Sequence, residues 1–305
     1  RMRTGRERPS KLGTPDVLSQ GAMALRPPMS PKHRFLAALL GGPVDRIPVG
    51  NVVSVATVEL MAAAGARFPQ AHLEAATMAR LAAAGHEVLG YDTVMPVFSV
   101  TQEVAALGCE VHWGSPEMMP GARTHPFAAA DDLRLPEGWL EAPSIQVVLE
   151  ALQRLRRELG DHVAIVGKVM GPWSLSYHMM GVEEFLVKTV LEPDIARRSL
   201  EALKEVTIAF ARAQVQAGAD LICLADHATG GMVSPVMYRE LLLPIHQEIT
   251  AAVGCPMVLH CCGNTSDRLR DFAETGVACY HFESQVPLAE AVAATRGKIT
   301  LMGNI

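Results

Sequence analysis

Short apolar segments alternate with longer segments of helical spacing along most of this chain. The apolar segments are nearly continuous, which is typical of parallel strands that are buried on both faces. The stretches 71–89, 144–159, 183–217 and 235–253 are instead rich in Ala, Leu, Glu and Arg at helical intervals. The pattern therefore predicts a parallel sheet covered by helices. Seven strands are expected, at residues 47–53, 93–98, 163–169, 220–225, 257–261, 278–282 and 299–302.

Length and strand count favour a barrel over a nucleotide-binding sheet. No G-x-G-x-x-G follows the first predicted strand, which disfavours a Rossmann fold. The 305 residues are enough for an α/β fold of the (β/α)8 TIM barrel type, which takes about 250 residues, plus an N-terminal extension. Seven βα units are one short of this barrel, and an open parallel sheet exposes two apolar edges. Because the sequence stops after the seventh predicted strand, we expect the eighth strand to be missing from this chain.

The chain divides into an N-terminal extension and one catalytic domain. Ser30 and Pro31 are suited to be the N-cap and first residue of a helix that runs to about residue 40. We therefore assign residues 1–28 to a flexible extension and residues 29–305 to a C-terminally incomplete barrel. Basic residues concentrate in the extension, where a solvated arm is favoured over contact with nucleic acid or an anionic surface. These residues are Arg1, Arg3, Arg6, Arg8 and Lys11.

Composition excludes several classes of protein. The chain is 49% hydrophobic with a net charge of −5, which fits a globular core and argues against disorder. No apolar run reaches the ~20 residues that span a bilayer, and no signal peptide is visible. We therefore expect a cytoplasmic protein with neither a membrane nor a nucleic-acid partner, while its oligomeric state is not indicated. The 6 cysteines are expected to be reduced thiols.

A histidine and a cysteine two residues apart form the sharpest local signal. Alternate residues of a strand face the same side, so His260 and Cys262 point together toward the mouth of the barrel, while Cys261 faces the helices. Imidazole and thiolate together suit Zn²⁺. An H-x-C pair alone is more typical of a buried histidine among core thiols. A catalytic zinc site also needs a third protein ligand, and His281 is the only later candidate near a strand end.

The ends of the other predicted strands are also polar, which core packing does not require. Taken singly, each polar residue is more typical of a cap or a turn, but a ring of them at one face is typical of a barrel active site. We assign catalytic roles to Asp226 and Glu283. The expected pocket residues are Asn51, Ser54, Ser99, Gln102, Trp173, His227 and Asn304.

Several segments resemble a known superfamily. Residues 29–39 and 43–49 resemble the opening of the uroporphyrinogen decarboxylase superfamily. A further set of segments resembles the methylcobamide:coenzyme M methyltransferase branch of this superfamily. The similarity runs from about residue 29 to the end of the chain. These segments are 50–57, 68–72, 85–87, 90–92, 225–230, 234–235, 243–244, 260–263 and 302–304.

The resemblance implies a zinc-dependent methyltransferase that moves a methyl group from a methylated corrinoid protein to a small thiol similar to coenzyme M. In that branch the residues that match His260 and Cys262 bind zinc, and a third ligand, a cysteine, lies on the eighth strand. That ligand is therefore expected beyond residue 305. The implied cofactors are zinc and a methylcobamide, the methyl donor, which is carried by a corrinoid-binding partner protein.

Two alternatives stay open at this stage. A porphyrin decarboxylase of the same superfamily would carry an Arg-Gln-Ala-Gly-Arg segment after its first strand, where this chain has Gly50-Asn-Val-Val-Ser54. It would also carry an aspartate where alignment places Ser99. A degenerate, non-catalytic member would keep His260 and Cys262 as core residues. The methyl acceptor is not fixed by the sequence and could be coenzyme M, another thiol or a folate.

Overall fold

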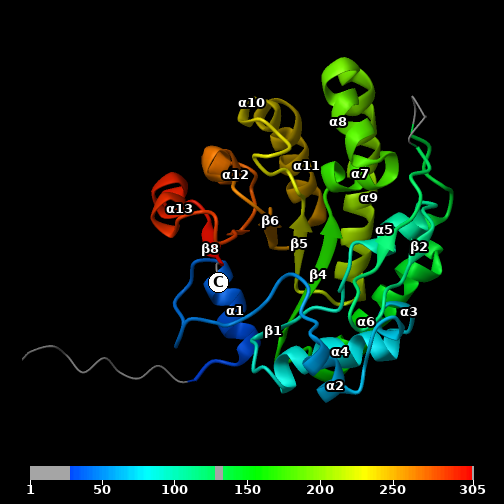
Figure 1. The fold of residues 1–305 in the computed structure, drawn as a ribbon. Helices are drawn as coiled ribbons and strands as arrows, with labels where there is room; N and C mark the ends of the chain where they lie inside the picture. Colours follow the sequence, from blue (N-terminus) through cyan, green and yellow to red (C-terminus); the bar gives the residue numbers. More distant parts are fainter. Residues whose placement is uncertain (1–27, 128–132, 304–305) are drawn as a thin grey trace, which may run out of the picture.

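The computed structural model describes residues 28–127 and 133–303 (Figure 1). The expected extension at 1–28 lies outside this part of the chain except for its last residue, and so does Asn304. Six parallel strands form one sheet in the order β1-β4-β5-β6-β7-β8, which curls like half a barrel with helices outside it. Six of the seven predicted strands are thus confirmed. They are β1 (Thr93–Val94), β4 (Ala164–Met170), β5 (Leu221–Ala225), β6 (Met257–His260), β7 (Cys279–His281) and β8 (Thr300–Met302).

Helices cover the outer face of this sheet. The predicted helix at 183–217 forms as two, α8 (Val182–Leu191) and α9 (Pro193–Ala217), because Pro193 cannot continue a helix but begins one well. None of the described helices has both the length and the apolar character needed to cross a bilayer. The other helices are α2 (Val58–Ala64), α3 (Gln70–Leu73), α4 (Ala75–Glu87), α5 (Thr101–Ala106), α6 (Pro143–Leu159), α7 (Pro172–Met180), α10 (Pro235–Met237), α11 (Leu243–Val253), α12 (Leu269–Phe272) and α13 (Leu288–Thr295).

Smaller elements interrupt this regular pattern. An antiparallel pair, β2 (Val111–His112) and β3 (Gly121–Ala122), was not predicted, since two-residue strands leave no hydrophobic period in the sequence. Two short 3-10 turns and one π-helical turn complete the described secondary structure. They lie at Trp139–Glu141, Ser266–Arg268 and Tyr238–Leu242.

Helix α1 (Pro31–Leu39) closes the amino-terminal end of the sheet. The Lys32 N–H donates to the carbonyl of His162, just before β4, and the Lys32 ammonium pairs with Asp220, just before β5, at 2.8 Å. The buried Phe35 faces the core from this helix. Because α1 covers one end of the strands, access to the interior is left at the carboxyl ends.

Residues 47–53 do not form the predicted first strand. The Asp92 N–H donates to the carbonyl of Val49 at 2.6 Å, but the Val49 N–H donates to the Asp92 carboxylate at 2.8 Å. Thr93 Oγ1 likewise accepts from the Asn51 N–H at 2.9 Å and donates to the Asn51 carbonyl at 3.1 Å. In a strand ladder, main-chain N–H and C=O groups of one segment bond to main-chain groups of the other. Here the side chains of Asp92 and Thr93 replace them, so the segment lies beside β1 without pairing as a strand.

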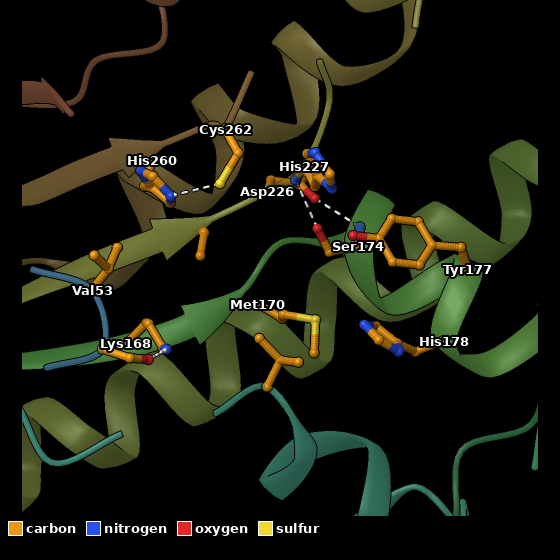
Figure 2. Close-up of a pocket in the computed structure, with 13 residues that line it drawn as sticks. Val53, Lys168, Met170, Ser174, Tyr177, His178, Asp226, His227, His260 and Cys262 are labelled. Atoms are coloured by element: carbon orange, nitrogen blue, oxygen red, sulfur yellow. Dashed lines mark hydrogen bonds between the residues drawn. The ribbon is translucent and has the colours of Figure 1, made fainter. Parts of the chain in front are cut away.

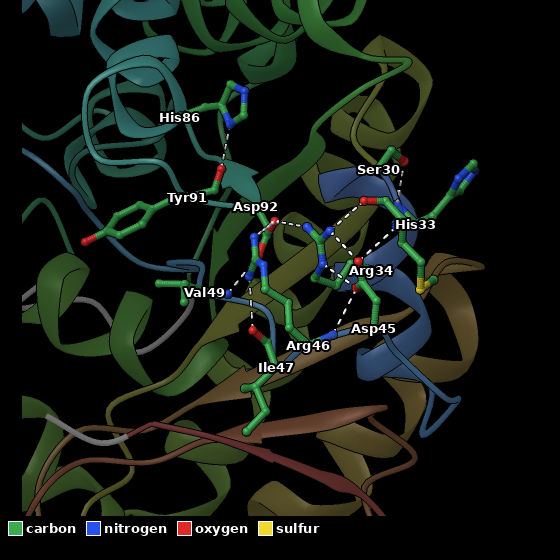
Figure 3. Close-up of polar contacts among 11 residues, drawn as sticks. Ser30, His33, Arg34, Asp45, Arg46, Ile47, Val49, His86, Tyr91 and Asp92 are labelled. Carbon is green, nitrogen blue, oxygen red and sulfur yellow. Dashed lines mark hydrogen bonds and ion pairs between the residues drawn. The ribbon is translucent and has the colours of Figure 1, made fainter. Parts of the chain in front are cut away.

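A buried ion-pair network fixes this segment (Figure 3). The Arg34 guanidinium donates to Asp45 at 2.6 and 2.8 Å and to Asp92 at 2.7 Å. Arg46 donates to both oxygens of Asp92, at 2.9 and 3.0 Å. Arg34 holds the pKa of the Asp45 carboxyl well below its usual range, mainly through these hydrogen bonds. Asp92 is only 1% exposed, so its carboxylate depends on these two arginines for its charge partners.

Replacing Asp92 by Asn tests this network. The change should lower the free energy of unfolding by about 3 kcal/mol, because it leaves Arg34 without one of its buried anionic partners. Urea unfolding followed by circular dichroism measures the loss. The matched control is Glu150→Gln, which removes an exposed pair with Arg154 and should cost at most about 0.5 kcal/mol. Equal, small losses in both variants would show that the network does not hold the segment.

Candidate active site

The register of the parallel strands aligns one residue from each of five strands near their carboxyl ends. Met170 pairs with Ala225, Ala225 with His260, His260 with His281, and His281 with Met302. Polar residues that follow β4, β5 and β6 are therefore brought to the same edge of the sheet. This is the edge at which barrel enzymes carry their active sites.

A cavity of about 280 Å³ opens at this edge (Figure 2). Drug-sized ligands occupy sites of about 300–1,000 Å³, so this cavity suits a smaller molecule. Its walls combine apolar side chains with polar groups from the ends of β4, β5 and β6, from α7 and from the segment before α2. The polar lining residues are Ser54, Lys168, Ser174, Tyr177, His178, Asp226, His227, His260 and Cys262.

His260 and Cys262 lie together in this lining. The His260 Nε2 is 3.0 Å from the Cys262 Sγ (Figure 2). The His260 Nδ1 is 2.9 Å from the Nδ1 of His281. Burial, and then the neighbouring His281, lowers the pKa of His260 to about 3. Burial, and then the charge of Glu283, raises the pKa of the Cys262 thiol. Cys261 is 1% exposed and is absent from the cavity lining.

The donor chemistry of this pair fits a metal ion such as zinc. A neutral imidazole binds Zn²⁺ at about 2.0–2.1 Å and a thiolate at about 2.3 Å, so two such ligands of one ion lie close to each other. Burial keeps His260 neutral, as a metal ligand must be, and a bound metal would displace the proton of Cys262. Within the described ranges, no set of three or more His, Cys, Asp or Glu side chains is arranged to hold a metal ion. A complete site therefore requires further ligands.

Asp226 is held by a chain of buried hydrogen bonds. Its carboxylate accepts from the Ser174 N–H at 2.8 Å and contacts His246 Nε2 at 2.9 Å. The hydroxyl of Tyr238 lies 2.9 Å from the other ring nitrogen of His246. A Cβ on Gly171 would lie only 2.2 Å from the Asp226 side chain, so only glycine fits there. Asp226 thus fixes the start of α7 against the end of β5, in addition to lining the cavity.

Lys168 is one of the site residues that the sequence analysis missed. It projects from β4 into the cavity, where its Nζ donates to the Ser54 Oγ at 3.2 Å. Burial lowers the pKa of Lys168 and raises the pKa of the nearby Glu103 to about 7. The Glu103 carboxylate accepts from the N–H of Met170 at 2.8 Å. The signal in the sequence is a lysine inside an otherwise apolar strand, whereas the predicted site residues lie at or after the ends of the predicted strands.

Tyr177 and His178 were also missed, although they lie about one helical turn after the predicted pocket residue Trp173. Both line the cavity from α7, beside His227 (Figure 2). Burial raises the pKa of Tyr177 to about 12 and lowers the pKa of His178 to about 4. This wall is therefore uncharged at neutral pH at these two positions, and it offers hydrogen-bonding groups rather than ionic ones.

The remaining predicted site residues that the structure describes occupy two different places. Asn51 and Glu283 line a second cavity of about 440 Å³, which also contacts His260. Glu283 accepts a short hydrogen bond from the Gly263 N–H and so holds the loop after Cys262. Three predicted pocket residues, Ser99, Gln102 and Trp173, are instead buried in packing positions outside the lining of both cavities.

Fold and site together define an α/β half-barrel with a histidine–cysteine pair at its mouth. The chain matches the uroporphyrinogen decarboxylase (URO-D) family over residues 30–305, and it belongs to that family. It is 33% identical over 281 residues to "methylated-thiol--coenzyme M methyltransferase" of Methanosarcina mazei, covering 91% of this chain and 75% of the relative. It is 34% identical over 277 residues to the methylcobamide:CoM methyltransferase MtaA of Methanosarcina barkeri, covering 90% and 82%. A uroporphyrinogen decarboxylase of Xanthomonas campestris is 29% identical over 307 residues, covering 91% and 82%.

Solved structures agree with this grouping. A methyltransferase from Methanosarcina mazei superposes with a TM-score of 0.87 at 34% identity, covering 90% of this chain and 83% of that one. A B12-independent methionine synthase from Shewanella sp. W3-18-1 superposes with a TM-score of 0.54 at 12% identity. The second likeness concerns the fold alone.

Glu103→Gln tests the buried carboxyl beside Lys168. A folded-state pKa of about 7, against an ordinary 4.5, means that the folded protein binds more protons than the unfolded chain between these values. The contribution of Glu103 to the free energy of unfolding therefore falls as pH rises from 4.5 to 7. Above pH 7 this contribution is constant. Urea unfolding should show the Gln variant gaining, relative to the unmodified protein, about 3 kcal/mol from pH 4.5 to pH 8.

The exposed Glu158→Gln removes one carboxylate elsewhere and serves as the control for this measurement. A parallel pH dependence in the unmodified protein and the Glu103→Gln variant would contradict the assignment.

Proposed function

We propose that this chain is a zinc-dependent methyltransferase that moves a methyl group from a methylated corrinoid protein to a small thiol, coenzyme M or a close analogue. The observation that carries the proposal is the His260–Cys262 pair at the mouth of a small cavity. It occurs in a chain about one third identical, over nine-tenths of its length, to methylcobamide:CoM methyltransferases. We further propose that the curled sheet is part of a complete (β/α)8 barrel.

His260 and Cys262 are the residues that would hold the zinc. When bound, the metal lowers the pKa of a coordinated thiol, so that the acceptor sulfur is present as a nucleophilic thiolate near neutral pH. His260 needs no deprotonation for this role, because burial already keeps its imidazole neutral. The loop that carries Cys262 is fixed by the hydrogen bond from Gly263 to Glu283. A third protein thiolate from outside the described residues would complete the ligand set.

The cavity walls orient the acceptor and limit its size. About 280 Å³ is enough for a thiol of a few heavy atoms. Tyr177, His178 and His227 form one wall. In the transfer, a sulfur–carbon bond forms as the cobalt–carbon bond of the methylated corrinoid breaks, and both electrons of that bond stay on cobalt. The corrinoid is too large for the cavity, so its partner protein must present it at the mouth.

The alternative of porphyrin decarboxylation is disfavoured by the charge of the cavity. Porphyrin substrates of that kind carry four to eight carboxylates, which need several arginines or lysines. Lys168 is the one arginine or lysine in the lining of the described cavity. A degenerate role is disfavoured because His260 and Cys262 line a cavity and contact each other instead of packing among core thiols.

Cys262→Ala and Cys261→Ala form a matched test of the metal pair. Zinc content after dialysis should fall in the Cys262 variant, with an affinity at least about 10-fold lower, and should be retained in the Cys261 variant. Methyl transfer from free methylcobalamin to 2-mercaptoethanesulfonate, followed by the absorbance of Co(I), should be lost only in the Cys262 variant. Equal zinc loss in both variants would overturn the ligand assignment. A zinc-loaded protein that methylates no thiol would overturn the activity.

A further inference from the structure

Lys168 is a buried amine for which the described part of the protein offers no ion-pair partner within 4 Å. Its side chain is 5% exposed. The other buried lysines, Lys188 and Lys204, each lie within 4 Å of glutamates, and no such pair involves Lys168. A buried ammonium without a counter-charge is costly. An incoming anion would offset this cost by pairing with the protonated amine of Lys168.

The hydrogen bonds around Lys168 leave donors free toward the cavity. An ammonium has three N–H groups, and Ser54 accepts one of them at 3.2 Å. The Ser54 hydroxyl donates its own proton to the carbonyl of Phe98 at 2.6 Å, so it can only accept from Lys168. The buried Glu103 carboxylate accepts from the N–H of Met170. It interacts electrostatically with Lys168 but does not form a direct ion pair with it. Two ammonium donors are thus available to a ligand.

Lys168 lies one layer below the proposed metal pair on the same side of the sheet. Met170 belongs to the row that contains His260, and Lys168 precedes it by two residues. Two residues of a parallel strand span about 6.6 Å, so the ammonium and the His260–Cys262 pair face the cavity at different depths. Figure 2 shows Lys168 across the cavity from this pair. A ligand that contacts both must be short, with its sulfur and its anionic group separated by a few bonds.

The backbone that carries Lys168 is rigidly held. Gln214 of α9 accepts from the Lys168 N–H at 3.0 Å and donates to the Lys168 carbonyl at 2.8 Å. A Cβ on Gly167 would lie 2.7 Å from the Gln214 amide oxygen, so glycine makes room for this contact. Both main-chain groups are therefore fixed before any ligand binds, and only the side chain adjusts. Such preorganisation reduces the ordering cost of binding.

We propose that Lys168, positioned by Ser54, binds the anionic end of the thiol acceptor, a sulfonate or a carboxylate, while the sulfur lies at His260 and Cys262. The inference rests on the proposed methyl transfer, whose acceptor, coenzyme M or a close analogue, is itself a short anionic thiol. It adds a specificity-determining residue to the site. Neutral thiols of the same length lack the group that balances the buried charge.

The test compares thiols of equal reach and different charge. Methyl transfer from free methylcobalamin is measured with 2-mercaptoethanesulfonate, 3-mercaptopropionate and 2-mercaptoethanol. The unmodified protein should have a kcat/KM about 10- to 100-fold higher for the better of the two anionic thiols than for the neutral one. Lys168→Met should reduce this ratio to near one, and Lys168→Arg should retain a preference for the anionic thiols. Lys298→Met, at an exposed lysine paired with Glu274, should leave the ratio unchanged.

A binding measurement separates this inference from the proposed activity. Calorimetric titration with 2-(methylthio)ethanesulfonate, which has no thiol and needs no turnover, should give a dissociation constant about 10- to 100-fold higher in Lys168→Met than in the unmodified protein. If the zinc-loaded protein methylates no thiol, the proposed function fails, while this titration still tests the anion site. If the unmodified protein shows no preference for anionic over neutral ligands, the inference is overturned, whether or not Lys168→Met folds. If Lys168→Met is folded and keeps the preference, it is overturned as well.

The conservative variant Lys168→Arg distinguishes anion binding from a different chemical role of the same lysine. A buried lysine can also act as an amine nucleophile that forms a Schiff base. Arginine keeps the positive charge but cannot form a Schiff base. Retention of the anionic preference in Lys168→Arg therefore supports anion binding, whereas loss of transfer to every thiol in a folded Lys168→Arg variant would support amine chemistry and overturn the inference.

Discussion

The hydrogen-bonded register of the parallel strands is the constraint on which the site depends. It places Met170, Ala225, His260, His281 and Met302 in one row. Because side chains alternate along a strand, a slip of one residue in β6 would turn His260 toward the helices and bring its neighbours inward. The same alternation places the side-chain amine of Lys168, two residues before Met170, in the cavity. Hydrophobic burial of the strands on both faces therefore specifies the position of polar groups that contribute little to the core.

Where the sheet lacks a neighbouring strand, polar side chains replace its hydrogen bonds. Asp92 binds the N–H of Val49 beside β1. Further along β4, beyond the two residues that pair with β1, Gln214 binds both main-chain groups of Lys168 and Glu103 binds the N–H of Met170. Buried main-chain groups without partners are costly, so these side chains are required by the fold. Several polar residues near the cavity are therefore structural, although polarity alone would suggest a role in binding.

The predictable part of the structure is the part that hydrophobic patterning controls. Six strands follow continuous apolar runs, and Ser30 caps α1 as its position before a proline indicates. The pair of His260 and Cys262 follows from strand alternation. The first predicted strand was wrong because its partners are side chains, which leave no periodic signal. Trp173 has a polar atom and follows a strand, but it packs on Phe185 with ring centroids 4.9 Å apart. Only tertiary packing distinguishes such a residue from a ligand contact.

In the proposed methyl transfer, the two ends of the cavity would contribute in different ways. The charge of a sulfonate or carboxylate does not change as a methyl group reaches the sulfur, so Lys168 would bind the ground state and the transition state about equally. Binding of that kind lowers KM without raising kcat, except where it holds the sulfur in line with the methyl group. Charge would change at the sulfur, which becomes a neutral thioether, and in the proposed site this change would occur beside His260 and Cys262. Rate should therefore depend mainly on the histidine–cysteine end and acceptor selectivity on the lysine end. Acceptors with one methylene more or fewer between sulfur and anion should keep the charge contact but lose alignment, so that kcat falls more than binding affinity.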